Sequence, residues 1–319
     1  MSSSDLSYTT ADILNARPAK NQVDPTQPYA FLVEREASAN GTLVDVATLF
    51  LTNRECPFHC LMCDLWKNTT DESIASGLIP RQMEFALRQL PPAQHIKLYN
   101  SGNFFDPKAI PRQDYPAIAE LCRSFEHVVV ENHPLLCNSH CLEFRELLVG
   151  TTFEVALGLE TVHPQVLPKL NKQMTLDDFA RAVEFLREHS IAVRSFILLN
   201  LPFVSDASGV DWALKSMEYA FSLGVGCCSV IPTRTGNGLM EKLSAEGQFS
   251  EPRLSAVEEV LERGIGVFGN QGRVFVDLWD LERFADCRLC VTTRKERLEQ
   301  MNLMQQILPR VTCSCEAVR

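Results

Sequence analysis

The chain carries three closely spaced cysteines in the stretch Asn53-Arg54-Glu55-Cys56-Pro57-Phe58-His59-Cys60-Leu61-Met62-Cys63. Three thiolates in the pattern C-x3-C-x2-C suit an iron–sulfur cluster with one iron left open, because a four-iron cluster normally takes four cysteine ligands. That open iron can bind a small molecule directly. A zinc site with His59 as fourth ligand, or a group of reduced core thiols, are the alternatives.

The position of these cysteines in the sequence favours the cluster. Residues 44–51 read Val-Asp-Val-Ala-Thr-Leu-Phe-Leu, an apolar and β-branched run that predicts a buried strand just before the cysteines. In barrel-like α/β enzymes the loop at the carboxyl end of a parallel strand carries the chemistry. We therefore interpret the cysteine loop as part of an active site.

The rest of the chain alternates short apolar runs with amphipathic segments. This alternation predicts parallel strands joined by crossover helices, and six such units form an α/β fold of the open (β/α)6 partial TIM barrel type. A helix over residues 176–189 opens with a predicted capping box at Thr175 and Asp178. The expected strands are residues 44–51, 95–100, 127–131, 153–158, 191–199 and 227–231, and two further expected helices are 81–90 and 115–124.

The 319 residues divide into three predicted parts. Residues 1–40 are rich in Ser, Pro and Asn and predict an irregular leader. Residues 41–270 hold the barrel core, and residues 271–319 form a small cysteine-rich C-terminal appendage. The appendage contains a C-x2-C and a C-x-C pair, a spacing typical of a metal site. The metal could be zinc or an auxiliary iron–sulfur cluster, and the absence of any metal is the third alternative. Its four cysteines are Cys287, Cys290, Cys313 and Cys315.

Polar side chains near the ends of the expected strands are candidates for binding a cofactor. They are Asn100, Ser101, Gly102, Glu131, Glu160 and Arg194. Gly102 permits a close backbone approach, and the amide and hydroxyl beside it can accept hydrogen bonds from an ammonium group. The two glutamates could bind hydroxyl groups, and Arg194 could pair with a carboxylate. An ordinary turn and solvated carboxylates are the alternatives.

The cysteine spacing resembles the signature of the radical S-adenosylmethionine (SAM) superfamily. Five further segments resemble one branch of it, which contains the Elongator catalytic subunit and, closer still, the radical SAM subunit of archaeosine synthase. They are Ser-Gly-Asn-Phe-Phe-Asp-Pro (101–107), Glu-Asn-His-Pro (131–134), Gly-Leu-Glu-Thr (158–161), Asn-Lys-Gln-Met-Thr (171–175) and Leu-Pro-Phe (201–203). The resemblance runs from roughly residue 44 to residue 265. It departs from the family where Asn-Ser-Gly replaces the usual Gly-Gly-Glu segment.

The resemblance implies that Cys56, Cys60 and Cys63 hold a four-iron four-sulfur cluster whose open iron binds SAM. In the family, the reduced cluster cleaves SAM to a 5′-deoxyadenosyl radical, which removes a hydrogen atom from a substrate. It also implies that Met62 lies against the adenine and that an electron donor such as flavodoxin or ferredoxin is a partner. Because the Gly-Gly-Glu segment is replaced, the alternative is a non-catalytic, zinc- and thiol-rich binding or regulatory protein on a degenerate barrel.

Composition narrows the partners and the compartment. A net charge of −10 and a pI of about 5.3 give no electrostatic footprint for nucleic acid, so a small biosynthetic molecule stands beside a tRNA nucleoside as substrate. The polar start of the chain lacks the apolar region of a secretory signal, and no stretch is long enough to span a bilayer. We expect a reducing cytoplasm and no membrane partner. Substrate identity and catalytic side chains are not predicted.

Overall fold

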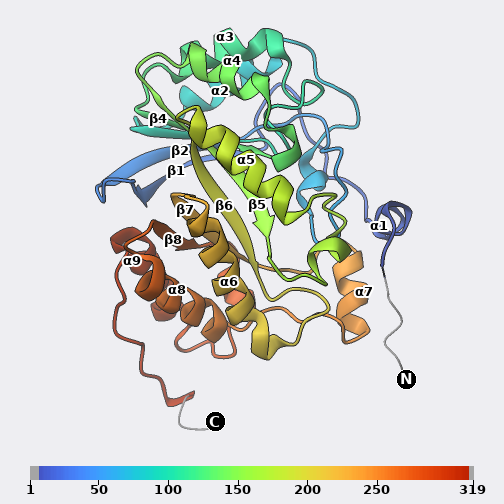
Figure 1. Ribbon diagram of the computed structural model, residues 1–319, viewed down its shortest axis with the longest axis vertical. Helices are drawn as coiled ribbons and strands as arrows, with labels where there is room; N and C mark the ends of the chain where they lie inside the picture. Colours follow the sequence, from blue (N-terminus) through green and yellow to red (C-terminus); the bar gives the residue numbers. More distant parts are fainter. Residues whose placement is uncertain (1–6, 316–319) are drawn as a thin grey trace.

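The computed structural model describes residues 7–315, and its centre is an eight-stranded sheet that curls into a partial barrel (Figure 1). The strands follow one another across the sheet in chain order. They are β1 (Ala30–Ala37), β2 (Leu43–Phe50), β3 (His95–Tyr99), β4 (His127–Asn132), β5 (Thr152–Glu160), β6 (Ala192–Leu199), β7 (Cys227–Pro232) and β8 (Arg273–Val276). Strand β1 is antiparallel to β2, and all other neighbours are parallel. The predicted (β/α)6 partial barrel is confirmed, with β2 to β7 as its six core strands.

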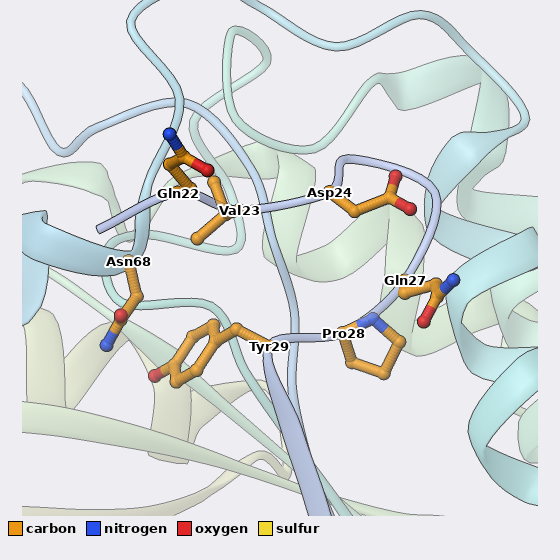
Figure 2. A pocket seen from close by; sticks show the side chains of 7 residues that line it. All are labelled: Gln22, Val23, Asp24, Gln27, Pro28, Tyr29 and Asn68. Atoms are coloured by element: carbon orange, nitrogen blue, oxygen red, sulfur yellow. The ribbon is translucent and has the colours of Figure 1, made fainter. Parts of the chain in front are cut away.

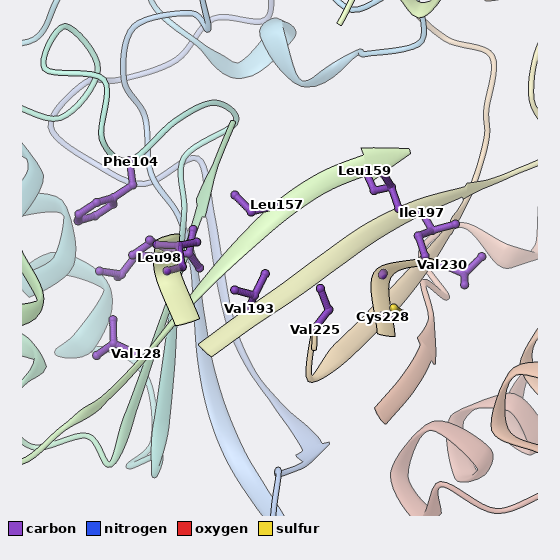
Figure 3. Packing of buried hydrophobic residues seen from close by; sticks show 14 of the residues in the cluster. Leu98, Phe104, Val128, Leu157, Leu159, Val193, Ile197, Val225, Cys228 and Val230 are labelled. Carbon is purple, nitrogen blue, oxygen red and sulfur yellow. The ribbon is translucent and has the colours of Figure 1, made fainter. Parts of the chain in front are cut away.

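The two faces of the sheet carry different side chains, because successive residues of a strand point to opposite faces. Figure 3 shows apolar side chains of the outer face, which pack beneath the helices. Among them are Leu98, Val128, Leu157, Ile197 and Val230. The residues that alternate with them point into the barrel, and many of these are charged or aromatic. The apolar residues that predicted the strands are therefore mainly those that pack against the helices on the outer face.

Helices cover the outer face of the sheet and its ends (Figure 1). They are α1 (Thr10–Ala16), α2 (Leu78–Leu87), α3 (Tyr115–Cys122), α4 (Ser139–Leu147), α5 (Leu176–Glu188), α6 (Gly209–Ser222), α7 (Leu239–Ala245), α8 (Leu254–Phe268) and α9 (Val291–Met304). The three predicted helices are confirmed as α2, α3 and α5, and α5 begins with the predicted capping box at Thr175 and Asp178. No helix within residues 7–315 is both long and apolar enough to cross a membrane.

The leader differs from the prediction, because it is not irregular throughout. It contains helix α1 and strand β1, and β1 pairs along its whole length with β2. Residues 1–6 of the leader and 316–319 of the appendage lie outside the described residues. The division of the chain at residues 40 and 270 stays a prediction.

Charged side chains fill the amino end of the barrel interior. Arg194 of β6 contacts Glu154 on the neighbouring β5, with 3.2 Å between Nε and Oε1. It also contacts Glu36 on the distant β1, with 2.6 Å between Nη2 and Oε1, so this ion pair spans the concave side of the sheet. Lys97 of β3 and Arg273 of β8 approach the same Glu36 carboxylate. Lys97, Glu154 and Arg194 are 5%, 1% and 3% exposed, so this charged layer closes the barrel at that end.

Helix α9 covers the outer edge of the sheet at β8. The side-chain amide of Asn302 accepts a hydrogen bond from Val276 N (3.1 Å) and donates one to Val276 O (2.9 Å). Gln305 makes the same pair of bonds to Val274, at 2.8 and 3.0 Å. The two amides take the place of a neighbouring strand, which satisfies backbone groups that an edge strand leaves open.

Candidate active site

The cysteine loop follows β2 at the carboxyl edge of the barrel, and side-chain amides from three other loops hold it. Asn100, after β3, donates to Asn53 Oδ1 (3.1 Å). Asn171, in the segment between β5 and α5, donates to His59 O (2.8 Å). Asn237, after β7, donates to the backbone oxygens of Leu61 (2.8 Å) and Cys63 (3.2 Å). Because amides satisfy both donors and acceptors of a loop backbone, the loop keeps one conformation without regular secondary structure.

The three thiols of this loop are largely buried. Burial raises the pKa of Cys56 to about 11 and those of Cys60 and Cys63 to about 12. Free thiols in this setting stay protonated at neutral pH, whereas a bound metal holds them as thiolates. The side-chain amide of Asn103 lies 3.1 Å from Cys56 Sγ and donates to it. Such a donor stabilises a thiolate.

Glu131, at the end of β4, holds the loop that follows β3. Its Oε1 accepts from the backbone N–H of Asn100 (2.6 Å) and Gly102 (3.4 Å). Burial raises the pKa of Glu131 to about 7, against the lowering effect of these backbone donors. The predicted site residues Asn100, Ser101, Gly102 and Glu131 therefore lie together beside the cysteine loop. In the described part of the chain, Asn100 Oδ1 is buried and has no hydrogen-bond partner.

A buried ion pair lies next to the thiols. Lys172 Nζ is 2.8 Å from Oε1 of Glu160, which ends β5 with a left-handed φ of 64°. Burial lowers the pKa of Lys172, but the charge of Glu160 and, after it, the nearby Cys60 and Cys56 sulfurs outweigh burial and raise the pKa above its usual value. Gly158 leaves the room for this pair, since a Cβ there would lie 2.2 Å from Glu160 Oε1 and 2.6 Å from Lys172 Nζ. The site thus holds a buried lysine, paired with Glu160, beside the thiols.

His133 braces the cysteine loop from below the same edge. Its ring stacks on Phe58, with ring centres 3.7 Å apart. Its Nδ1 accepts from Leu135 N (3.2 Å), so Nε2 carries the proton and donates to Lys172 O (3.0 Å). Burial, followed by the charge of Lys172, lowers the pKa of His133 to about 3. His133 is therefore neutral and acts as a structural brace.

The N-terminal leader forms one wall beside the site. Tyr29 Oη lies 2.8 Å from Ser101 Oγ, and burial raises the pKa of this tyrosine. Tyr29 also lines a cavity of about 210 Å³ between the leader and Asn68, which Figure 2 shows. The other lining residues are Gln22, Val23, Asp24, Gln27 and Pro28. A polar opening therefore lies beside the loops that carry the site.

Aromatic side chains lie between this edge and the charged layer. Tyr99 of β3 is 6.1 Å, centre to centre, from both Phe50 of β2 and Phe196 of β6. Tyr99 and Phe196 follow Lys97 and Arg194 by two residues, so they point into the barrel on the same face. All three rings are half-buried. The barrel interior thus has a charged floor and an aromatic wall below the cysteine loop.

Arg194 does not reach this site, which corrects the prediction that it binds a cofactor. It lies at the amino end of β6, in the charged layer, and its guanidinium is occupied by Glu36 and Glu154. Met62, predicted to lie against an adenine, packs with two small apolar clusters that include Leu61 and Leu170. Its contact with adenine stays a prediction, as do the ligand roles of the other site residues.

Sequence reasoning missed four residues of this site. Lys172 and Asn103 lie inside segments that carried the family resemblance, but their type alone gave no role. Asn237 and Tyr29 lie in a turn-like segment and in the leader, and only the fold brings them to the cysteine loop. A signal existed in the clustering of asparagines after expected strands, since buried amides commonly tie loops together.

The appendage brings its four cysteines together. Their sulfur atoms all lie within 4.8 Å of one another, and the pairs Cys287–Cys313 and Cys290–Cys315 are each 3.9 Å apart. Within residues 7–315 this is the one group of three or more His, Cys, Asp or Glu side chains that is so compact. The group could therefore hold a metal ion.

Comparison with known proteins identifies relatives in sequence. No protein-family model matches the chain. The chain is 23% identical to archaeosine synthase subunit beta of Methanosarcina acetivorans, over 87% of this chain and 84% of that protein. It is 22% identical to an uncharacterized protein of Methanocaldococcus jannaschii, over 92% of this chain and 86% of that protein. It is also 27% identical to archaeosine synthase subunit beta of Thermococcus kodakarensis, over 52% of this chain and 53% of that protein.

Solved structures share the fold. Queuine lyase from Clostridium spiroforme, bound to SAM and queuine, superposes with a TM-score of 0.51 at 13% identity, over 80% of this chain and 94% of that chain. Elp3 of the archaeon Methanocaldococcus infernus superposes with a TM-score of 0.53 at 15% identity, over 70% of this chain and 59% of that chain. Methylornithine synthase superposes with a TM-score of 0.53 at 14% identity, over 95% of this chain and 82% of that chain. The chain is thus similar in sequence to archaeosine synthase subunit beta, and it shares its fold with queuine lyase, Elp3 and methylornithine synthase.

Proposed function

We propose that Cys56, Cys60 and Cys63 hold a four-iron four-sulfur cluster that binds SAM at its open iron. The observation that carries this proposal is the architecture of the cysteine loop. Side-chain amides from three separate loops hold it, two through its backbone oxygens and one through the side chain of Asn53, and holding a loop in one conformation costs conformational entropy. The fold that these residues share with radical SAM proteins supports the same assignment.

The residues around the loop fit SAM. Asn100 Oδ1 is a buried acceptor without a partner, which suits a ligand ammonium group. Lys172 carries a positive charge beside the thiols, which suits a carboxylate and offsets the negative charge of a thiolate-bound cluster. Gly102 lies directly beside Cys56, because a Cβ there would be in van der Waals contact with Cys56 Cβ, at 3.5 Å. Asn103 donates to the Cys56 sulfur and would tune its cluster.

When bound, the cluster and SAM supply reductive cleavage of SAM to a 5′-deoxyadenosyl radical that takes a hydrogen atom from the substrate. The residues of the chain position the bound groups and exclude water from the barrel interior. Phe50, Tyr99 and Phe196 form an apolar wall below the loop, and the charged layer closes the floor. An enclosed, largely apolar interior protects a reactive intermediate from side reactions.

The substrate is a tRNA nucleoside or a small biosynthetic molecule. Two relatives are named for archaeosine and one structural neighbour is bound to queuine, and the aromatic wall suits a flat ring. The acidic chain weighs toward the small molecule. We further propose an electron donor such as flavodoxin or ferredoxin, a reducing cytoplasmic location, and a metal at the appendage cysteines.

Anaerobically reconstituted protein tests this function. With dithionite and SAM we expect 5′-deoxyadenosine, measured by liquid chromatography, and loss of both product and loop-bound iron in Cys60→Ala. Cys137→Ala is the matched control, since Cys137 belongs to neither cysteine group. Zinc without iron, and no SAM cleavage after reconstitution, would instead establish a non-catalytic thiol-rich binding protein.

A further inference from the structure

We propose that Cys287, Cys290, Cys313 and Cys315 bind one tetrahedral metal ion of the zinc class, and that this ion clamps helix α9 over the β8 edge. The proposal concerns the appendage alone and does not depend on SAM chemistry. It assigns the metal by geometry, which the cysteine spacing left open between zinc and an auxiliary iron–sulfur cluster.

The sulfur positions match a single ion. Zinc–sulfur bonds of about 2.3 Å in a tetrahedron place the sulfurs about 3.8 Å apart. Cys287 and Cys313 are 3.9 Å apart, as are Cys290 and Cys315, and all four sulfurs lie within 4.8 Å. A four-iron cluster places each thiolate on a different iron and therefore spreads the sulfurs further. The gathered thiols leave no room for such a cluster among them.

The four cysteines bracket α9. Cys290 is the residue before the helix, and Cys313 and Cys315 lie in the irregular segment that follows the helix and returns along it. Closing these ends upon one ion ties the start of α9 to the end of the described chain. Binding a divalent ion releases the thiol protons and makes no change in oxidation state.

Helix α9 needs such a tie, because its own apolar contact is small. Only Arg297, Leu298 and Met301 of its residues are buried. Arg297 donates to the returning chain, at Leu308 O (2.6 Å) and Pro309 O (2.7 Å), and also pairs with Glu258 and Glu262 of α8, so its contacts are polar and not apolar. A segment with so little core gains its stability from a staple. The amides of Asn302 and Gln305 then stay in register with the β8 edge.

The loop between the first two cysteines faces solvent. Leu289 is 83% exposed, and the loop also carries Arg288. All four ligand positions are filled by cysteines of the same segment, so the ion keeps no open site for a substrate. The site is therefore structural and closed, in contrast to the cysteine loop with its three thiols.

Metal analysis of the full chain tests the metal. We expect about one zinc per chain in addition to cluster iron. Cys315→Ala should lose the zinc and keep the iron, whereas Cys60→Ala should lose the iron and keep the zinc. Cobalt bound in place of zinc should show the visible spectrum of a tetrahedral tetrathiolate. Loss of iron in Cys315→Ala, or absence of any metal at this site, would overturn the assignment.

Amide hydrogen exchange tests the clamp. Removing zinc from wild-type protein with a chelator should speed exchange at Val274 and Val276 by about tenfold or more, as local opening predicts. Exchange at Val155 in the barrel centre serves as the internal control. Unchanged exchange at β8 after verified zinc loss would refute the clamp. Because chelation acts on folded wild-type protein, a misfolded variant cannot confuse the result, and the separate iron readout keeps this test distinct from SAM chemistry.

Discussion

Gly158 lies beneath the ion pair that borders the thiols. Its missing side chain leaves the space that the Glu160–Lys172 ion pair occupies. We predict that Gly158→Ala displaces this pair, lowers the free energy of unfolding by about 1–3 kcal/mol and lowers SAM cleavage by about tenfold or more. Chemical denaturation and product analysis measure both effects.

Gly226→Ala is the matched control for this change. Its Cβ would meet nothing nearer than Val193 O at 4.0 Å, and its φ is ordinary. It should leave SAM cleavage unchanged. Wild-type activity in Gly158→Ala would show that the ion pair has no part in the site.

Glu131 makes stability depend on pH in a direction unusual for a carboxyl group. Burial raises its pKa to about 7, above the unfolded value of about 4.3, so the folded state holds the proton longer. Its contribution is fully present below the unfolded pKa and is lost as pH rises to about 7, by on the order of 1–3 kcal/mol. We predict that Glu131→Gln removes this loss, because its amide oxygen still accepts from the loop and carries no charge.

Urea denaturation at pH 5 and pH 7 measures this effect as a difference between variant and wild type. Glu126→Gln, an exposed carboxyl nearby, should follow the wild type. Equal pH dependence in wild type and Glu131→Gln would show that Glu131 does not titrate in this range.

At the scale of single residues, the sequence predicted which residue types belong to the site better than it predicted where each residue lies in the fold. The cysteine motif named its own residues, and Asn100, Gly102 and Glu131 do converge on it. Arg194 was misplaced by half a strand, since a residue at the amino end of a strand lies far from the carboxyl edge. Lys172 could not be foreseen, because its positive charge is set by a partner that only the fold supplies.

At the scale of elements, the loop after β7 reaches across the barrel to the cysteine loop. Asn237 donates to two of its backbone oxygens and accepts from Met240 N (2.8 Å). We predict that Asn237→Asp keeps the acceptor, loses both donors and lowers stability by about 1–3 kcal/mol, since buried carbonyls lose their partners. Iron per chain after reconstitution should fall with it.

Asn138→Asp is the control for Asn237→Asp. Asn138 acts as an acceptor at the start of α4, where aspartate caps a helix equally well. This variant should keep its iron. Full iron content in Asn237→Asp would mean that the cysteine loop holds its conformation without this amide.

The strands were predictable because their outer residues are uniformly apolar, and all six core strands lie where their apolar runs indicate. Strand β1 escaped prediction for the opposite reason. Its residues Glu34 and Glu36 look like a polar leader, but the fold brings Lys97 to both carboxylates and Arg194 to Glu36, which is largely buried. Periodicity in one segment carries no information about such partners.

At the scale of the whole molecule, the charged layer joins strands from both edges of the sheet. Burial opposes the charge of Glu36, but Arg194 and Lys97 hold its pKa well below its usual range. Its stabilisation is therefore present above the unfolded pKa of about 4.3 and is lost as pH falls toward the folded value. We predict that Arg194→Met lowers the free energy of unfolding at pH 7 by about 1–3 kcal/mol, because Glu36 and Glu154 lose a buried cation and keep only their other partners.

The double variant Glu36→Gln/Arg194→Met separates lost charge from lost packing. It should recover part of the stability, and its stability should change less between pH 7 and pH 4 than that of the wild type. Denaturation curves at the two pH values provide the measurement. No recovery in the double variant would mean that packing of the arginine, and not its charge, supports the layer.

The closed floor of the barrel also determines traffic. With the amino end blocked by Lys97, Glu154 and Arg194, no molecule can pass through the interior from one end to the other. A polymer wider than the mouth can offer only a single protruding unit to the interior, while the remainder of it stays outside on the rim.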